Sequence, residues 1–373
     1  MTCNRAPLGH SLHAVNETGG PEEDPGKRLM RGQPATVWCL DTLCLEGDRV
    51  LVDGWALAPA GSKPALSVNG VRLPAVFGIP RPDLARLMAF DERAPTAGFR
   101  GDLEGAAALA PGRESLELHL CDDATLRPFN PAHAFYWPLR PPGHALPDAA
   151  RRRRVHGDER EEGFVISGYS TYRKLTAALA EHSRAWEDFD GILDWGCGCG
   201  RVHRYLPERA LARLTGADID ADNIEWCRRS LPGCRFHCLA LLPPAPLPEA
   251  GFDLVIAVSV FTHLREAAQH AWLGELARVT RRGGLVLATI HGPAAGARAN
   301  LSREQADAWG AAGFLASGLS VDLKGAIADE TYYVNSLHSH DYVRREWGRH
   351  FEILRIVDCT IANHQDLVVM RRR

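Results

Sequence analysis

The sequence predicts an α/β fold with a seven-stranded, doubly wound sheet, preceded by a small, mainly β, sandwich-like domain. Three observations predict it: short β-type runs fill the first part of the chain, strand-length apolar runs alternate with amphipathic segments after Gly163, and a glycine-rich turn follows the first of those strands. Such alternation is typical of a parallel sheet with both faces covered. A chain of 373 residues has room for two domains of this kind.

Composition divides the chain into four parts. Residues 1–33 lack apolar periodicity and are expected to form a disordered tail, and residues 34–140 carry the β-type runs. Residues 141–162 are rich in proline and charge and are expected to be a linker, while residues 163–373 carry the α/β pattern. We interpret the basic run Arg151 to Arg154 as a solvated hinge rather than a nucleic-acid contact, because acidic residues follow it closely.

The β-rich part contains strand-like runs at 35–45, 49–58, 65–73 and 114–123, with one helical insert at 81–90. The α/β part contains seven strand-length apolar runs. They are residues 191–196, 213–219, 234–240, 252–260, 283–290, 350–358 and 366–371.

Charge and composition exclude several classes of function. The 43 Lys and Arg nearly balance the 46 Asp and Glu, so no global field attracts nucleic acid or an anionic membrane. No apolar run reaches the length of about 18 residues that a membrane span needs, and the N-terminal residues lack the apolar core of a secretory signal. Ten scattered cysteines without a CxxC pair indicate reduced thiols. We expect a cytoplasmic protein.

A glycine-rich turn between the first two strands of the α/β part is the strongest motif. Gly196, Gly198 and Gly200 allow the backbone to turn sharply and to approach a ligand closely. Asp194 ends the first strand and Asp218 ends the second, about 20 residues further on, where an acid can accept hydrogen bonds from ribose hydroxyls.

The segments LDWGCGCGR and GADID resemble motifs I and II of the class I, Rossmann-like methyltransferases that use S-adenosylmethionine (SAM). FDLVIAVSVFTHL, WLGELARVTRRGGLVLATIHG and QDLVVMRR are similar to later segments of the bacterial small-molecule enzymes of this family. The resemblance implies SAM as cofactor and S-adenosylhomocysteine (SAH) as product. A nicotinamide dehydrogenase is the competing interpretation, but its GxGxxG fingerprint lacks the acid at the strand end.

The resemblance also implies the cofactor-binding residues. The glycine turn lies against the methionine part of SAM, Asp194 helps to hold its ammonium group, Asp218 binds the ribose and Ile219 flanks the adenine. Leu239 stands after the third strand, where the family often has a polar residue. The full set is Asp194, Gly196, Cys197, Gly198, Gly200, Arg201, Asp218, Ile219, Leu239 and Ser259.

Residues that follow the fourth and fifth strands are expected to face the reacting groups, because ligands bind beyond the carboxyl ends of the strands. His263 and His291 follow those strands, and a segment before the sixth strand adds Tyr333, His338 and His340. A histidine can deprotonate an acceptor near neutral pH. The alternative for His263 is a structural role at the start of the next helix.

The absence of certain motifs narrows the class of molecule that can accept the methyl group. No [DN]PP[YFW] loop of amino-methylating nucleic-acid enzymes follows the fourth strand, and no acids cluster after the fourth and fifth strands, so no metal site is expected. The sequence thus predicts metal-independent methylation of an oxygen, or second a nitrogen, of a small molecule such as a secondary metabolite or saccharide. The alternative is a non-catalytic SAM-binding module in assembly or regulation. The expected partner is the small-molecule acceptor, without nucleic acid or membrane, and a homodimer is left open.

Overall fold

The computed structural model describes residues 36–373 except 90, 141, 300, 320–328 and 330–331. The predicted tail at 1–33 therefore lies outside the described residues. The chain separates into two compact units, Met1–Pro141 with Ala294–Arg303, and Pro142–Pro293 with Glu304–Arg373. The sequence-based boundaries differ from this division, because they place residues 294–303 within 163–373 and not in the first unit.

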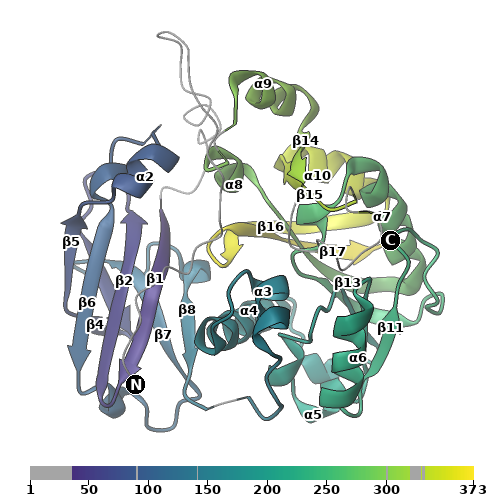
Figure 1. Ribbon diagram of the computed structural model, residues 1–373, viewed down its shortest axis with the longest axis horizontal. Helices are drawn as coiled ribbons and strands as arrows, with labels where there is room; N and C mark the ends of the chain where they lie inside the picture. Colours follow the sequence, from purple (N-terminus) through teal and green to yellow (C-terminus); the bar gives the residue numbers. More distant parts are fainter. Residues whose placement is uncertain (1–35, 90, 141, 300, 320–328, 330–331) are drawn as a thin grey trace. The chain divides into compact units, whose positions relative to one another are not determined.

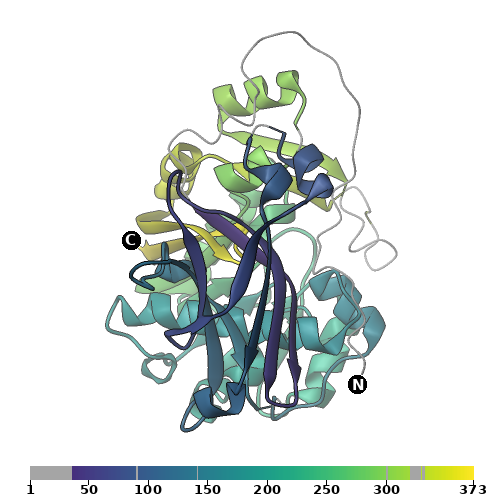
Figure 2. The same cartoon turned by 90° about the vertical axis from the view of Figure 1, so that its left-hand side faces the viewer.

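The first unit contains two four-stranded sheets whose strands run side by side (Figures 1 and 2). One sheet has the order β1-β2-β6-β5, with β1 (Val37–Glu46), β2 (Arg49–Leu57), β5 (Ala75–Ile79) and β6 (Gly98–Glu104). The other has the order β4-β3-β7-β8, with β3 (Pro64–Val68), β4 (Val71–Leu73), β7 (Ser115–Asp122) and β8 (Phe135–Pro138).

These two sheets pack against each other as the predicted sandwich. Gly101 of β6 lies so close to the other sheet that a Cβ atom there would be 2.1 Å from Leu73 Cδ2 and 3.3 Å from Leu66 Cδ1. The predicted helical insert is confirmed as α2 (Pro82–Leu87), which starts with a proline and buries Leu84. The short 3₁₀ helices of this unit are η1 (Ala94–Thr96), η2 (Ala106–Leu109) and η3 (Pro131–His133).

The second unit is built on a seven-stranded sheet of order β11-β10-β9-β12-β13-β17-β16. Its strands are β9 (Ile192–Trp195), β10 (Leu214–Asp218), β11 (Arg235–Cys238), β12 (Phe252–Ala257), β13 (Thr280–Ile290), β16 (Phe351–Ile361) and β17 (Gln365–Arg372). All seven predicted runs are confirmed as strands. Only β17 is antiparallel to its neighbours, so the beginning of β17 meets the carboxyl end of β13, where Ile290 pairs with Asp366.

Helices cover both faces of this sheet. Alternate residues of β13 point in opposite directions: Val286 packs in a core cluster with Trp272, whereas Leu287 packs in another with Leu175. The α-helices of this unit are α3 (Ala149–His156), α4 (Glu161–Ala180), α5 (Glu208–Leu211), α6 (Ala221–Ser230), α7 (Glu266–Val279), α9 (Arg303–Ala312) and α10 (His340–Glu346). Helix α8 (Pro293–Ala297) crosses the boundary between the two units. The 3₁₀ helices are η4 (Trp186–Asp188), η5 (His203–Tyr205), η6 (Phe261–His263) and η7 (Trp347–Arg349), and β14 (Phe314–Leu319) pairs with β15 (Val334–His338).

The expectation of an irregular linker at 141–162 was wrong for helix α3. The linker prolines all precede residue 148, and Asp148 caps the helix by accepting a hydrogen bond from Arg151 N at 2.9 Å. Gly157, with φ of 82°, ends it. The basic run is also less solvated than expected, since Arg154 Nη1 lies 2.7 Å from the buried carboxylate of Asp220. Among the helices in the described part of the chain, none has the length and apolarity of a membrane span.

Candidate active site

The turn after β9 has the conformation that its glycines permit. Gly196, Gly198 and Gly200 have φ angles of 80°, 51° and 74°, in the left-handed region that disfavours side chains. A Cβ atom at Gly196 would lie 2.1 Å from Val260 Cγ2, so this position has no room for one. The turn lies between β10 and β12, where the strand order reverses and open α/β sheets bind their ligands.

Asp218 at the end of β10 is tied to this turn. Its Oδ2 accepts a hydrogen bond from Gly198 N at 2.7 Å, and its Oδ1 accepts one from Asp220 N at 2.8 Å. Burial raises the pKa of Asp218 to about 6, although these two hydrogen bonds oppose the shift. Each carboxylate oxygen has a second lone pair, so the side chain can still accept hydrogen bonds from a pair of hydroxyl groups.

Asp194 at the end of β9 has a partner that the sequence analysis missed. Its Oδ2 lies 2.6 Å from His203 Nε2, and both side chains are buried. His203 begins η5, directly after the glycine turn. A buried carboxylate is costly unless it is paired, so His203 explains how an acid is kept beneath this turn.

The remaining residues of the predicted cofactor set differ in their surroundings. The hydrogen bond with the Cys227 thiol and burial raise the pKa of Cys197 well above its ordinary value, so Cys197 is a neutral, buried thiol. Arg201 Nη1 donates to Ser167 Oγ at 2.8 Å, which ties the turn to α4. Ile219 is half-buried, and Leu239 is a buried core residue whose N–H donates to the Asp218 carbonyl at 2.8 Å.

Ser259, which follows β12, has a φ of 60°, an uncommon conformation for a residue other than glycine. Its N–H donates to Thr289 Oγ1 at 2.7 Å, and its hydroxyl lies 2.9 Å from Nε2 of Gln365. Thr289 Oγ1 also donates to Gln365 Oε1 at 2.6 Å. The ends of β12, β13 and β17 are thus joined by one polar network around Ser259.

Three of the four predicted catalytic residues come together in what we call the ring cluster: His263, Tyr333, His291 and His364. The rings of His263 and Tyr333 are stacked, with centroids 4.4 Å apart and planes at 14°. His291 lies 6.1 Å from His263 and 5.0 Å from His364, both edge-on. All four side chains are partly exposed.

His364 was missed because it lies in the turn between β16 and β17, which is far in sequence from the strand ends that the sequence analysis considered. That turn is strained, with φ of 53° at Ala362 and 51° at Asn363. The buried Lys174 of α4 donates to Asn363 Oδ1 at 3.1 Å.

His338, the fourth predicted catalytic residue, lies in the core instead. Gln269 Nε2 donates to the carbonyls of Phe261 and Leu264, so its Oε1 must accept the hydrogen bond from His338 Nε2 at 2.9 Å. Burial lowers the pKa of His338 to about 3, so the ring is neutral. Since His338 N donates to the His291 carbonyl at 2.8 Å, its geometry suits a positioning residue better than a base.

Comparisons with known proteins match the part of the chain that carries the glycine turn. A family model described as a methyltransferase domain matches residues 192–284. The chain is 32% identical over 132 residues to a fatty-acid O-methyltransferase of Mycolicibacterium smegmatis, covering 34% of this chain and 47% of that protein. It is 32% identical over 123 residues to a malonyl-[acyl-carrier protein] O-methyltransferase of Salmonella typhimurium, covering 30% of this chain and 46% of that protein.

The matched segment therefore spans about half the length of these curated relatives. Among solved structures, the N-methyltransferase NodS from Bradyrhizobium japonicum WM9, in complex with SAH, aligns at 15% identity with a TM-score of 0.36. That alignment covers 55% of this chain and 86% of the NodS chain. The family model includes Asp194, the glycine turn, Asp218 and His263, whereas His291, Tyr333 and His364 lie beyond it.

Proposed function

Because the chain carries a class I SAM-dependent methyltransferase domain, we propose that it transfers the methyl group of SAM to an oxygen of a small-molecule acceptor. The ring cluster is the observation that carries the proposal. His263 and His291 follow β12 and β13, the two strands that come after β9 in the order of the sheet, and their rings lie 6.1 Å apart. Ring nitrogens and a phenol at this edge of the sheet can hold and deprotonate an acceptor oxygen.

The residues around the turn fit SAM. Asp218 would accept the ribose hydroxyls, the glycine turn would lie against the methionine part, and Asp194, held by His203, would balance the ammonium group. When bound, SAM supplies an electrophilic methyl group on a positively charged sulfur. The contribution of the protein is alignment of the acceptor with that group, together with the acceptor's correct protonation state.

A carboxylic acid is the acceptor class that we propose first. Two relatives are named as O-methyltransferases of a fatty acid and of a malonyl-carrier protein, which supports an acidic oxygen. A carboxylate is already ionised at neutral pH, so the ring cluster would then orient it by hydrogen bonds. An alcohol would instead need His263 or His291 as base, and nitrogen is the second candidate atom.

We also propose that the transfer step needs no metal, because alignment and a deprotonated oxygen suffice for displacement at a sulfonium. The near balance of charges supports a small-molecule partner rather than nucleic acid, and a cytoplasmic location is part of the same proposal.

Alkaline treatment of the product tests the acceptor class. The protein is incubated with methyl-labelled SAM and panels of acids, alcohols and amines, and the labelled products are then treated with alkali. Methyl esters of acids release volatile labelled methanol, whereas ethers and N-methyl products keep the label. Label released by alkali supports a carboxylic acid acceptor, and alkali-stable label would contradict it. SAM binding without labelled product from any panel would favour the non-catalytic binding module.

A further inference from the structure

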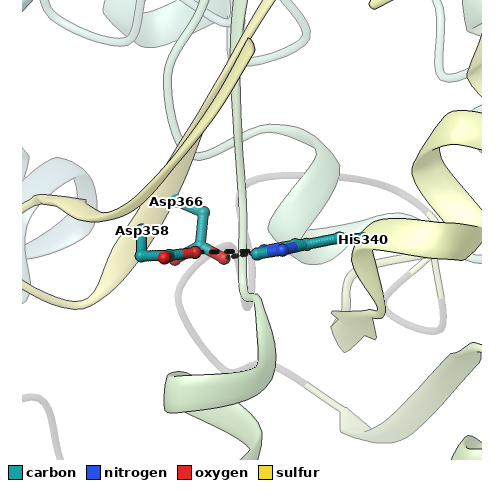
Figure 3. Close-up of side chains that lie close together, drawn as sticks. All are labelled: His340, Asp358 and Asp366. Carbon is teal, nitrogen blue, oxygen red and sulfur yellow. Dashed lines mark hydrogen bonds and ion pairs between the residues drawn. The ribbon is translucent and has the colours of Figure 1, made fainter. Parts of the chain in front are cut away.

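Three side chains with metal-binding atoms meet near the beginning of β17, outside the ring cluster and the predicted cofactor-binding set. They are His340 at the start of α10, Asp358 near the end of β16, and Asp366 in β17, and one ligand atom of each lies within 4.8 Å of the others (Figure 3). His340 Nε2 lies 2.7 Å from Asp366 Oδ2 and 3.4 Å from Asp358 Oδ1.

The backbone places these side chains firmly. The side chain of Asp366 is fully buried, and its Oδ1 accepts a hydrogen bond from Cys359 N at 2.8 Å, which leaves Oδ2 directed at His340. Gly292 makes room for this carboxylate, since a Cβ atom there would lie 1.7 Å from Asp366 Oδ2. The register of β16 with β17 is irregular between Val357 and Ile361, the stretch that contains Asp358.

The two acidic side chains of this cluster lie close to each other as well as to the imidazole. Two carboxylates face one imidazole, and a buried carboxylate beside another is unfavourable without a compensating cation. Arg344 is close enough to affect Asp358 and His340, but its guanidinium hydrogen-bonds to Asp341. A divalent cation between the three side chains would offset the repulsion between the two carboxylates.

We propose that His340, Asp358 and Asp366 bind a divalent transition metal ion of the zinc type. Metal–ligand bonds of 2.0–2.2 Å in a tetrahedral site place the ligand atoms about 3.4 Å apart. The pair formed by His340 and Asp358 has this spacing already, and the shorter contact to Asp366 needs only a small side-chain rotation. One imidazole with two carboxylates suits zinc, manganese or iron(II) better than magnesium or calcium, which prefer oxygen ligands only.

Such an ion would tie α10 to the beginning of β17. Three protein ligands also leave a coordination position for water or a small anion. The prediction that the chain has no metal site considered only acids that follow the fourth and fifth strands. The structure brings acids to the same edge of the sheet from the sixth and seventh strands.

Cobalt binding tests this site independently of methyl transfer. The full-length protein is treated with a chelator, dialysed, and titrated with Co²⁺, whose visible absorption reports ligation by the protein. We expect one ion per chain that Zn²⁺ displaces and Mg²⁺ at equal concentration does not. Asp358→Asn, a change at a half-exposed side chain, is expected to weaken binding about tenfold or more, with an unchanged circular dichroism spectrum.

The control variant is His270→Gln. It removes a partly exposed histidine whose Nε2 lies 3.9 Å from Glu266, a pair that belongs to no cluster of three metal-binding side chains among the described residues, and should leave the titration unchanged. The absence of saturable Co²⁺ binding would overturn the proposal. Equal binding by the wild type, Asp358→Asn and His340→Gln would do so too, because it would show adventitious binding at surface histidines only.

Discussion

His203 Nε2 lies 2.6 Å from Asp194 Oδ2, and neither side chain has more than a few per cent of its surface exposed. The glycine turn lies between these two residues in the sequence, so the pair joins both ends of the predicted cofactor loop. The buried carboxylate of Asp194 is therefore stabilised by a histidine that the glycine-rich motif alone does not indicate.

His203→Phe is therefore expected to weaken SAM binding by about 1.5–3 kcal/mol, the usual cost of removing a hydrogen bond to a buried charged group. Calorimetric titration with SAM gives the value. His203→Gln keeps a donor at this position and should retain most of the affinity. Equal affinities of wild type and His203→Phe would show that the pair does not support the cofactor loop.

Asp218→Ala is expected to weaken SAM binding by a similar amount, about 1.5–3 kcal/mol, because the ribose hydroxyls lose a charged acceptor. The pH dependence of SAM binding by the wild type tests the role of Asp218 more specifically. The pKa of Asp218 is raised by burial to about 6, so the ionised acceptor is lost as the pH falls below that value. We expect SAM affinity to be full above pH 7 and about tenfold lower at pH 5.

The control for this pH dependence is Asp218→Asn, which does not titrate and should bind SAM weakly but equally at pH 5 and pH 7.5. Calorimetry at both pH values decides the question. A wild-type affinity that stays constant over this range would mean that Asp218 is not the ribose acceptor.

His263→Ala and His291→Ala should each lower turnover while SAM binding stays intact. The expected loss is about 10- to 150-fold if the rings hold a carboxylate by hydrogen bonds. It is about 10²–10⁴-fold if one ring is the base for an alcohol. Steady-state kinetics with calorimetry separates these effects, and His182→Ala outside the ring cluster is the control. Turnover within a few-fold of wild type in both variants would place the acceptor elsewhere.

His338 makes the stability of the protein depend on pH. Burial lowers the pKa of His338 to about 3 in the folded protein, while an exposed histidine has a value near 6.5. The unfolded chain therefore binds a proton that the folded protein excludes, and stability falls as the pH drops below 6.5. The slope approaches about 1.4 kcal/mol per pH unit.

Urea unfolding at pH 7, 6 and 5 measures this slope. His338→Gln keeps a donor for Gln269 but does not titrate, so it should have a smaller slope than the wild type. Identical slopes in the two proteins would contradict the burial of a neutral His338.

Chelation should leave the transfer reaction intact, even if the cluster of His340, Asp358 and Asp366 binds a metal, because none of these residues belongs to the ring cluster. Turnover of the folded protein is measured with and without EDTA, below the temperature at which either sample unfolds. Loss of turnover that added metal restores would show that the transfer step is metal-dependent.

Most of the α/β sheet could be predicted from the sequence because its strands are continuous apolar runs, which are typical of a sheet that is buried on both faces. The glycine turn, Asp194 and Asp218 were accessible for a similar reason, since the motif is local in sequence. Strands β5, β6 and β8 were missed because they are short or rich in glycine, as at Gly98 and Gly101.

The candidate site residues that the sequence analysis missed come together through the topology of the sheet, and no local sequence pattern indicates them. His364 and Asp366 reach the end of β13 only because β17 runs antiparallel to it. His203 is a single histidine without a spacing signal, and its contact with Asp194 depends on the path of the chain after the turn. The surroundings of His338 could not be predicted for the same reason: its sequence position resembles that of a site residue, but the fold buries it against Gln269.

The most direct test of the account is the formation of SAH and labelled product from methyl-labelled SAM with a panel of small carboxylic acids. Wild-type protein should form the two in equal amounts with at least one acid. Asp218→Ala should require a higher SAM concentration, and His263→Ala or His291→Ala should turn over slowly at saturating SAM. If the wild type binds SAM tightly but forms neither SAH nor product with any acid, alcohol or amine, the proposed methyl transfer is contradicted.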